Sequence, residues 1–217
     1  MKKKDSSSIS HMRRNYALGG LIETNIEKSP IDQFSIWFKE ALNSKILEAN
    51  AMTLATADKS GLASARIVLL KSFDEKGFIF FTNYESRKGK EIQETKKGTL
   101  LFFWDALERQ VRIEGKLKKI STKDSDEYFH SRPFESQVGA IASSQSKVLK
   151  SREELEKKYS ALLVQYKDKK VPMPKQWGGY ILEPSKIEFW QGRPSRLHDR
   201  ILYSKNKKGW KIERLYP

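Results

Sequence analysis

The chain has 217 residues and a formal net charge of +15, from 42 Lys and Arg against 27 Asp and Glu. This length suits one substantial domain, because domains typically contain about 100 to 200 residues. The chain has no cysteine, which excludes disulfides, thiolate metal sites and a cysteine nucleophile. It has only three histidines, so we expect no metal site. Any catalysis is therefore expected to depend on an organic cofactor.

The beginning of the chain, MKKKDSSSIS, is basic and polar and lacks the apolar stretch of a signal peptide. We expect residues 1–12 to form a disordered basic tail and residues 13–217 to form a single domain. No apolar run approaches the roughly 20 residues that span a bilayer, so we expect a cytoplasmic protein without membrane contact. The positive charge is compatible both with nucleic acid and with a phosphorylated small molecule.

In the first half of the chain, apolar positions at helical spacing after Ser29 and Pro30 predict an amphipathic helix over about residues 30–47. The segments AMTLATA, LASARIVLLKSF and FIFFTN, joined by the turns DKSG and DEKG, predict three antiparallel strands. Ser86 is a suitable N-cap for a short helix, which we expect Gly98 to end.

In the second half, TLLFFWD and ERQVRIEGKLKKI predict a strand pair joined tightly at Ala106 and Leu107. Two segments, TKDSDEYFHSR and SREELEKKYSALLVQYK, begin with Ser or Thr followed by acidic residues, which is typical of helix N-termini. The end of the chain reads as strands again, in GGYILEP, KIEFWQG, RILYSK and WKIERLY. Short antiparallel strands with a few peripheral helices predict a mainly β fold, a closed or partly closed barrel.

Two basic pairs are candidates for an anion site. Arg66 and Lys71 bracket four aliphatic residues in ARIVLLK and would lie on opposite faces of a regular strand; a core strand with two flanking charges is the alternative. Arg87 and Lys88 fall in the first turn of an expected helix, where cations are unfavourable unless an anion binds nearby.

Two further segments carry polar and basic groups at high density. YFHSRPFESQVGAIASSQS, residues 128–146, is rich in phosphate-compatible guanidinium and hydroxyl groups, with a polar connection between helices as the alternative. In EFWQGRPSRLHDR, residues 188–200, an extended conformation would place Arg196, His198 and Arg200 on one side. An exposed basic loop is the alternative for this segment.

Eight segments together resemble one family, the FMN-dependent pyridoxamine 5′-phosphate oxidases, also called pyridoxine 5′-phosphate oxidases. The segments are RRNYALGGL, RIVLLK, FFTNYESRKGKEI, LERQVRIEGK, YFHSRPFESQVGAIAS, QWGGY, IEFWQGRPSRLHDR and WKIERLYP, in the family's order, and they cover nearly everything from about residue 12 to residue 217. The resemblance implies an FMN-binding split β-barrel with FMN at the interface of a homodimer. A nucleic-acid-binding module is the alternative class, but the aromatic residues fall mostly at strand-core positions rather than among exposed basic residues.

By matching position, the resemblance implies two sets of contacts. Those to FMN are Arg66, Ile67, Val68, Leu69, Leu70, Lys71, Phe81, Thr82, Arg87, Lys88, Gln110, Gln145, Ser146, Trp190 and Arg200. Those to the substrate are Lys71, Tyr128, Arg132 and Ser136 on its phosphate, Arg196 and His198 as catalytic residues on the pyridine ring with Leu197 between them, and Arg13 and Tyr16 as a lid. Phe81 stands where a relative can have tyrosine, which keeps a ring contact but removes a hydroxyl.

The implied reaction moves a hydride from the aminomethyl or hydroxymethyl carbon of the substrate to the oxidised flavin. Pyridoxamine 5′-phosphate then gives pyridoxal 5′-phosphate and ammonia through hydrolysis of an imine, and pyridoxine 5′-phosphate gives the aldehyde directly. Molecular oxygen reoxidises the flavin and becomes hydrogen peroxide. The protein would contribute orientation and electrostatics. A flavin-binding split-barrel protein with an altered substrate is the alternative within the fold.

Overall fold

The computed structural model describes residues 14–217, so the predicted tail and Arg13 lie outside the described residues. The chain divides into two compact units that alternate along the sequence. Unit 1 contains the described residues up to Leu47 together with Phe103–Val111 and Glu188–Pro217, and unit 2 contains Glu48–Phe102 and Arg112–Ile187. The expectation of one domain over residues 13–217 stays a prediction.

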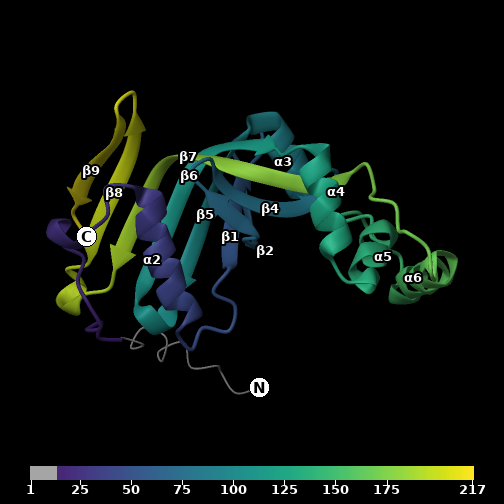
Figure 1. Cartoon of the computed structure of the whole chain (residues 1–217), viewed down its shortest axis with the longest axis horizontal. Helices are drawn as coiled ribbons and strands as arrows, with labels where there is room; N and C mark the ends of the chain where they lie inside the picture. The colour runs from purple at the N-terminus through teal and green to yellow at the C-terminus, as the bar shows by residue number, and fades with distance from the viewer. Residues whose placement is uncertain (1–13) are drawn as a thin grey trace, which may run out of the picture. The chain divides into compact units, whose positions relative to one another are not determined.

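Unit 2 begins with strands β1 (Ala51–Ala57), β2 (Ala63–Leu69), β3 (Ser72–Asp74) and β4 (Gly77–Asn83), of which Figure 1 labels β1, β2 and β4. They confirm the three predicted strands, except that the second is divided. The division falls at Leu70 and Lys71, because the chain changes its pairing partner there. The N–H of Leu70 donates to Asn50 O, continuing the β1–β2 pairing, whereas the N–H of Lys71 donates to Ile79 O in β4.

The remaining strands are β5 (Lys97–Trp104), β6 (Arg109–Lys119), β7 (Trp177–Gln191), β8 (Asp199–Asn206) and β9 (Gly209–Leu215). The sheet order is β2-β1-β5-β6-β7-β4-β3, and β8 pairs with β7 and β9. Where two strands were predicted, GGYILEP and KIEFWQG form the single strand β7, because Pro184 interrupts the sequence pattern but not the strand. The fold is thus mainly β, as predicted.

The helices α2 (Pro30–Leu42) and α3 (Arg87–Thr95) begin at the predicted serines, but α2 ends at Leu42 and not near residue 47, because Asn43 caps it. The Ser86 hydroxyl accepts the N–H of Gly89, which fixes the first turn of α3. The prediction that Gly98 ends this helix was wrong. Lys96 takes the left-handed conformation with φ 56° and caps α3, while Gly98 already belongs to β5.

Three helices, α4 (Thr122–Ser131), α5 (Phe134–Ala142) and α6 (Arg152–Tyr166), follow β6 (Figure 1). The first and third were predicted. Ser151 caps α6 as its segment indicated, whereas the N-cap of α4 is Ser121, one residue before the predicted start at Thr122. No helix was predicted for α5, in a segment for which a polar connection was considered. Its N-cap is Pro133, which provides no capping side chain, and its interior contains Gly139, which lowers helix propensity. Burial of Val138 and packing against α6 stabilise it instead.

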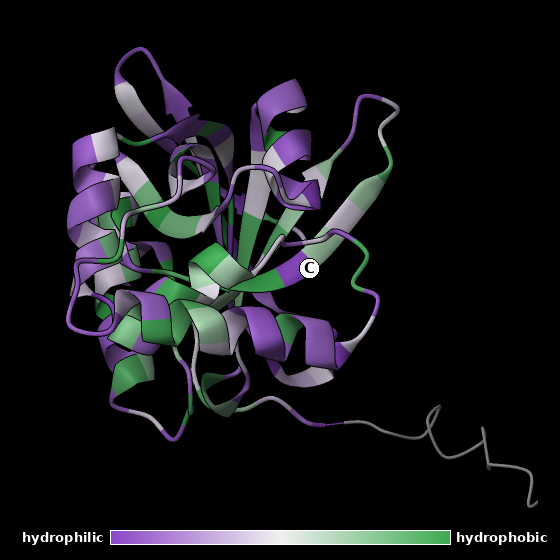
Figure 2. Ribbon diagram, turned by 90° about the vertical axis from the view of Figure 1, so that its right-hand side faces the viewer, coloured by the Kyte–Doolittle hydropathy of each residue, from purple (hydrophilic) through white to green (hydrophobic). Residues whose placement is uncertain are grey.

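Each unit has its own set of buried apolar side chains. Phe34, Trp37, Trp104 and Phe189 are almost fully buried in unit 1. The corresponding residues of unit 2 include Phe78, Phe80, Phe102, Phe129 and Leu182. Figure 2 shows green and purple residues side by side on the helices, as expected for elements with one apolar face. Within residues 14–217, no helix is both long and apolar enough to cross a membrane.

Candidate active site

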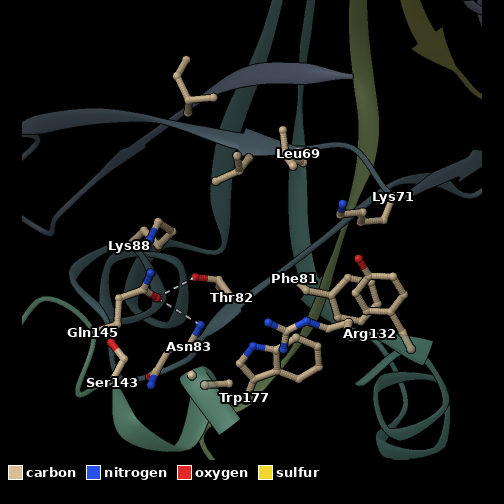
Figure 3. A pocket seen from close by; sticks show the side chains of 15 residues that line it. Leu69, Lys71, Phe81, Thr82, Asn83, Lys88, Arg132, Ser143, Gln145 and Trp177 are labelled. Carbon is tan, nitrogen blue, oxygen red and sulfur yellow. Dashed lines mark hydrogen bonds between the residues drawn. The ribbon is translucent and has the colours of Figure 1, made fainter. Parts of the chain in front are cut away.

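Unit 2 contains a cavity of about 460 Å³, which lies in the usual size range of small-molecule sites (Figure 3). Its wall comes from β2 and the following residues, from β4, and from the helices α3, α4 and α5 with the start of β7. The lining residues are Ile67, Val68, Leu69, Lys71, Phe81, Thr82, Asn83, Lys88, Tyr128, Arg132, Gly139, Ala140, Ser143, Gln145 and Trp177.

One side of the cavity carries a buried cation. Lys88, in the first turn of α3, is only 8% exposed, and burial together with the nearby Arg66 lowers its pKa. Within residues 14–217, its ammonium group forms no ion pair. A cation on a largely buried side chain is costly when no opposite charge pairs with it, so an anion at this end of the cavity would be stabilised both by Lys88 and by the N-terminus of α3.

Near Lys88, the buried carboxylate of Glu91 binds two neighbouring guanidinium groups, those of Arg66 and Arg87. Glu91 Oε1 accepts from Arg87 Nε at 2.8 Å, and Glu91 Oε2 lies 3.3 Å from Arg66 Nη2. The hydroxyls of Thr56 and Ser64 also donate to Glu91. Burial alone would raise the pKa of Glu91, but the hydrogen bonds from Thr56, Ser64 and Arg87 outweigh it and lower the pKa to about 2.

A polar edge of the cavity is formed by the segment after α5. The Gln145 side-chain oxygen accepts from the hydroxyl of Thr82 and the N–H of Asn83, each at 3.3 Å, as the dashed lines in Figure 3 show. These bonds fix the amide of Gln145 against β4. Its NH₂ group therefore remains available as a donor to a bound molecule.

The opposite side of the cavity is aromatic. Phe81 stacks on Tyr128 with ring centroids 3.9 Å apart and on Trp177 with centroids 5.3 Å apart. Tyr128, Phe81 and Trp177 all pack on the apolar cluster around Phe129. A flat wall of this kind suits the face of an aromatic ligand.

Arg132 joins this wall, with its guanidinium carbon 5.0 Å from the Trp177 ring centroid. Its Nη2 donates to Ser136 O at 2.8 Å, whereas Nη1 is buried and has no hydrogen-bond partner within residues 14–217. Burial lowers the pKa of Arg132, but arginine stays charged in proteins. A buried, unpaired guanidinium nitrogen at a cavity wall points to an anionic ligand group.

Many of the residues predicted for FMN and substrate phosphate thus meet at one cavity. Ten of them line it: Ile67, Val68, Leu69, Lys71, Phe81, Thr82, Lys88, Tyr128, Arg132 and Gln145. Three more predicted residues contact the lining residues or Glu91 without lining the cavity. Arg66 and Arg87 bind Glu91, and the carbonyl of Ser136 accepts a hydrogen bond from Arg132. Leu70 is 4% exposed, and Asn50 binds both its N–H and its carbonyl; Ser146 is exposed with φ 71°. Leu70 and Ser146 are not among the lining residues, and the FMN and substrate contacts of all these residues stay predictions.

A second group of predicted residues lies in unit 1. The rings of Trp190 and His198 have centroids 4.6 Å apart, and Tyr16 meets both edge-on at 5.8 and 5.7 Å. The backbone N–H of Arg193 donates to His198 Nδ1 at 3.1 Å. Because Nδ1 accepts, the neutral imidazole carries its proton on Nε2. Burial and then the nearby Arg196 lower the pKa of His198, which favours that neutral form.

The expectation that Arg196, His198 and Arg200 alternate along an extended segment was wrong. Pro194–Arg196 form a turn in which Ser195 and Arg196 have φ 55° and 62°, and β8 begins only at Asp199. Arg196 and Leu197 are exposed. Arg200 binds Glu188 through two nitrogens at 2.8 and 3.1 Å. Gln110 lies in β6, within the part that belongs to unit 1.

Sequence reasoning gave no role to five residues that line the cavity or to the carboxylate behind it. The five are Asn83, Gly139, Ala140, Ser143 and Trp177, and Glu91 binds the neighbouring guanidinium groups. Trp177 occurs in the QWGGY segment but received no role. Glu91 could have been found, because it follows Arg87 by four residues on a predicted helix, the spacing at which opposite charges meet. Within the described part of the chain, no cluster of three or more His, Asp or Glu could hold a metal ion.

The donor set fits FMN. Lys88 at the N-terminus of α3 suits its phosphate, and the Gln145 amide suits polar atoms of its ribityl chain or ring. The Phe81 stack suits an aromatic ring.

Two family models match the chain. The model described as pyridoxamine 5′-phosphate oxidase matches residues 38–166. The model described as the pyridoxine 5′-phosphate oxidase C-terminal dimerisation region matches residues 177–217. Together they cover both units.

Curated relatives share about half of their residues with this chain. A pyridoxine/pyridoxamine 5′-phosphate oxidase of Cyanothece sp. is 53% identical over 210 residues, covering 97% of this chain and 99% of that protein. A protein of the same name from Paraburkholderia phytofirmans is 52% identical over 213 residues, covering 97% and 100%.

Solved structures agree with the fold. PhzG from Burkholderia lata, in complex with tetrahydrophenazine-1-carboxylic acid, has a TM-score of 0.87 and 31% identity over 92% of this chain and 99% of its own. A pyridoxamine 5′-phosphate oxidase-related, FMN-binding protein from Nostoc punctiforme has a TM-score of 0.68 and 18% identity, with 85% and 97% covered, which shows the fold alone. The chain therefore has the FMN-binding split β-barrel fold, takes FMN as its cofactor, and belongs to the pyridoxine/pyridoxamine 5′-phosphate oxidase family of oxidoreductases.

Proposed function

We propose that the chain oxidises pyridoxamine 5′-phosphate and pyridoxine 5′-phosphate to pyridoxal 5′-phosphate, with molecular oxygen reduced to hydrogen peroxide. The observation that carries this proposal is the unpaired Nη1 of Arg132, buried beside the aromatic stack of Phe81, Tyr128 and Trp177. A phosphorylated aromatic amine or alcohol would supply an anion for Arg132. The names of the relatives that are 52% and 53% identical support the same substrates.

In this proposal, Arg132 binds the substrate phosphate through Nη1, while its bond from Nη2 to Ser136 O fixes the plane of the guanidinium. Tyr128 and Lys71 line the same cavity and add a hydroxyl and an ammonium donor. Charge-assisted bonds of this kind are about twice as strong as neutral ones. They would hold the substrate by the end of the molecule that does not react.

The FMN phosphate would bind at Lys88 and the N-terminus of α3, with Arg66 and Arg87 contributing positive charge. FMN, when bound, supplies the hydride acceptor of the reaction. Lys88 is buried without an ion-pair partner within residues 14–217, so binding an anion there offsets an existing electrostatic cost. The other predicted FMN contacts, Gln110, Ser146, Trp190 and Arg200 among them, belong to the same proposal.

Arg196 and His198 would orient the pyridine ring of the substrate. The imidazole of His198 accepts the Arg193 N–H at Nδ1, so it would act through Nε2 as a neutral hydrogen-bond donor rather than as a base. Arg196 would contribute a fixed positive charge. Tyr16, which meets the His198 ring edge-on, would limit the access of water.

We further propose that the active form is a homodimer with FMN at the subunit interface. The match of residues 177–217 to the family's dimerisation region supports this assembly. The substrate and FMN contacts need not all come from one subunit.

The second candidate function is oxidation of a tricyclic carboxylic acid, because PhzG, with a TM-score of 0.87, is in complex with tetrahydrophenazine-1-carboxylic acid. A carboxylate could also satisfy Arg132 Nη1. The lower identity of PhzG, 31% against 53% for the Cyanothece relative, favours the phosphorylated substrates.

A substrate panel tests the proposal. The FMN-loaded protein would be given pyridoxamine 5′-phosphate, pyridoxine 5′-phosphate, unphosphorylated pyridoxamine and tetrahydrophenazine-1-carboxylic acid, with peroxide as the readout. We expect kcat/KM to be highest for the two phosphorylated compounds. A higher value for the phenazine acid would replace the proposal with the second candidate, and equal values for pyridoxamine and its phosphate would remove the role of Arg132.

A further inference from the structure

Glu91 is the acidic residue that binds the two guanidinium groups beside the largely buried side chain of Lys88. Its side chain is 5% exposed, whereas those of Arg66 and Arg87 are 20% and 58% exposed. One carboxylate therefore joins a half-buried arginine of β2 to a surface arginine of α3. No role for Glu91 follows from the family resemblance or from the comparisons.

We propose that Glu91 is a positioning residue for the FMN phosphate, because it holds the guanidinium groups of Arg66 and Arg87 in the orientation that the phosphate requires. The inference rests on the proposed placement of the phosphate beside Lys88. Glu91 would not touch FMN itself. It would act through the two arginines.

Glu91 fixes the position of the guanidinium groups around it. An arginine side chain loses considerable rotamer entropy when it is fixed, so a partner that is already in place lowers the cost of ordering it on ligand binding. Glu91 holds Arg66 directly at 3.3 Å and through the hydroxyls of Thr56 and Ser64, which accept from Arg66 and donate to Glu91; Leu54 O accepts a further bond from Arg66 at 3.2 Å. Arg87 has only Glu91 as a hydrogen-bond partner within residues 14–217. Without Glu91, the exposed side chain of Arg87 would have no hydrogen bond to fix its orientation.

Glu91 also sets the net charge beside Lys88. With Lys88 protonated, the three cations and the single carboxylate of Glu91 carry a net charge of +2. A phosphate monoester carries about −1.5 to −2 charges at pH 7. Glu91 thus brings three mutually repelling cations together at a net charge that the FMN phosphate matches.

A positioning role and a role as a mere counter-charge predict opposite effects of removing the Glu91 charge on FMN affinity, which makes the inference testable. If Glu91 only supplied a counter-charge, Glu91→Gln would remove a repulsion from the phosphate and FMN would bind more tightly. If Glu91 positions the arginines, FMN would bind more weakly. A role in joining α3 to β1 alone would weaken every flavin equally, because the whole cavity would loosen.

The experiment compares FMN with riboflavin, which lacks the phosphate, by titrating the full chain stripped of flavin and following flavin fluorescence. We expect the unmodified protein to bind FMN more tightly than riboflavin. We expect Glu91→Gln to weaken FMN binding by about tenfold, the scale of one charge-assisted hydrogen bond, and to leave riboflavin binding unchanged. Glu94→Gln, an exposed carboxylate of the same helix, is the matched control and is expected to leave both affinities unchanged.

Ser64→Ala provides a second variant that keeps the carboxylate but removes a hydroxyl bound to both Glu91 and Arg66. It is expected to produce a smaller loss, again for FMN only. Unchanged or tighter FMN binding by Glu91→Gln would overturn the inference, and so would equal losses for FMN and riboflavin. If the unmodified protein did not distinguish FMN from riboflavin, the proposed phosphate site itself would fail, and the role of Glu91 with it.

Discussion

The guanidinium of Arg132 lies over the indole ring of Trp177, 5.0 Å from its centroid, and presents a buried Nη1 that has no hydrogen-bond partner within residues 14–217. Burying a charged nitrogen in this position is costly unless a ligand accepts a hydrogen bond from it. The aromatic stack and the unpaired cation together favour a flat ligand with an anionic arm. They connect the geometry of the cavity to the proposed substrate.

The first prediction concerns Arg132. Arg132→Met removes the unpaired cation but keeps apolar contact with Trp177, so we expect KM for pyridoxamine 5′-phosphate to rise by about 10- to 100-fold, the loss of a charge-assisted hydrogen bond. Turnover of unphosphorylated pyridoxamine should not change. Arg152→Met, on the exposed face of α6, is the control. Steady-state kinetics check this, and equal losses for both substrates would contradict it.

The second prediction concerns the proton on His198. Because Nδ1 accepts the Arg193 N–H, the working group is the Nε2 donor, whose position a glutamine amide can reach and an asparagine amide cannot. We therefore expect His198→Gln to retain more kcat/KM than His198→Asn. The pKa of His198 is lowered by burial and by Arg196, so the neutral ring persists at neutral pH, and the rate should fall only as acid protonates Nδ1 and breaks the bond from the Arg193 N–H that orients the ring. Equal rates for both variants would contradict the assignment.

The third prediction concerns the segment that carries Tyr16. Glu108 is 2% exposed, and its Oε2 accepts the N–H groups of Ala17 and Leu18 at 2.8 and 3.1 Å. Glu108→Ala leaves these amides without an acceptor, at a cost of about 1 to 3 kcal/mol. We expect faster hydrogen exchange at Ala17 and Leu18 and a higher KM, because Tyr16 is no longer held against His198. Unchanged exchange would show that the segment is held by other contacts.

The fourth prediction concerns stability in acid. The pKa of Glu91 is about 2 in the folded protein against a usual value of 4.5, so its contribution to the free energy of unfolding is fully present above pH 4.5 and is lost as the pH falls towards 2. Glu91→Gln lacks this contribution. The stability difference between the two proteins should therefore shrink between pH 4.5 and pH 2. Urea unfolding at several pH values measures it, and a constant difference would contradict the low pKa.

Most of the strands were predictable because turn residues separate short apolar segments, as at DKSG and DEKG. The exceptions have local causes. Pro184 divides the pattern of β7 without breaking the strand. The sequence does not predict α5, because Pro133 provides no capping side chain and Gly139 lowers the helix propensity. Tertiary packing stabilises this helix instead. The left-handed turn at Ser195 and Arg196 uses residues that rarely adopt positive φ, so the sequence pattern indicated an extended segment instead.

The candidate site was predictable in part for a different reason. Basic residues in the first turn of α3 already indicated an anion, and burial of Lys88 agrees with that interpretation. The orphan nitrogen of Arg132 and the stacking of Trp177 on Phe81 depend on contacts between distant segments, which no local pattern encodes. Glu91 follows from helical spacing, but only burial reveals that it binds two arginines.

The most direct test of the central proposal is the product formed by the FMN-loaded protein from pyridoxamine 5′-phosphate in the presence of oxygen. Pyridoxal 5′-phosphate, ammonia and hydrogen peroxide would be measured together. We predict that all three form in equal amounts, and that Arg132→Met reduces them in parallel when the substrate concentration is low. Peroxide without pyridoxal 5′-phosphate, or no turnover of a protein with FMN bound, would contradict the account.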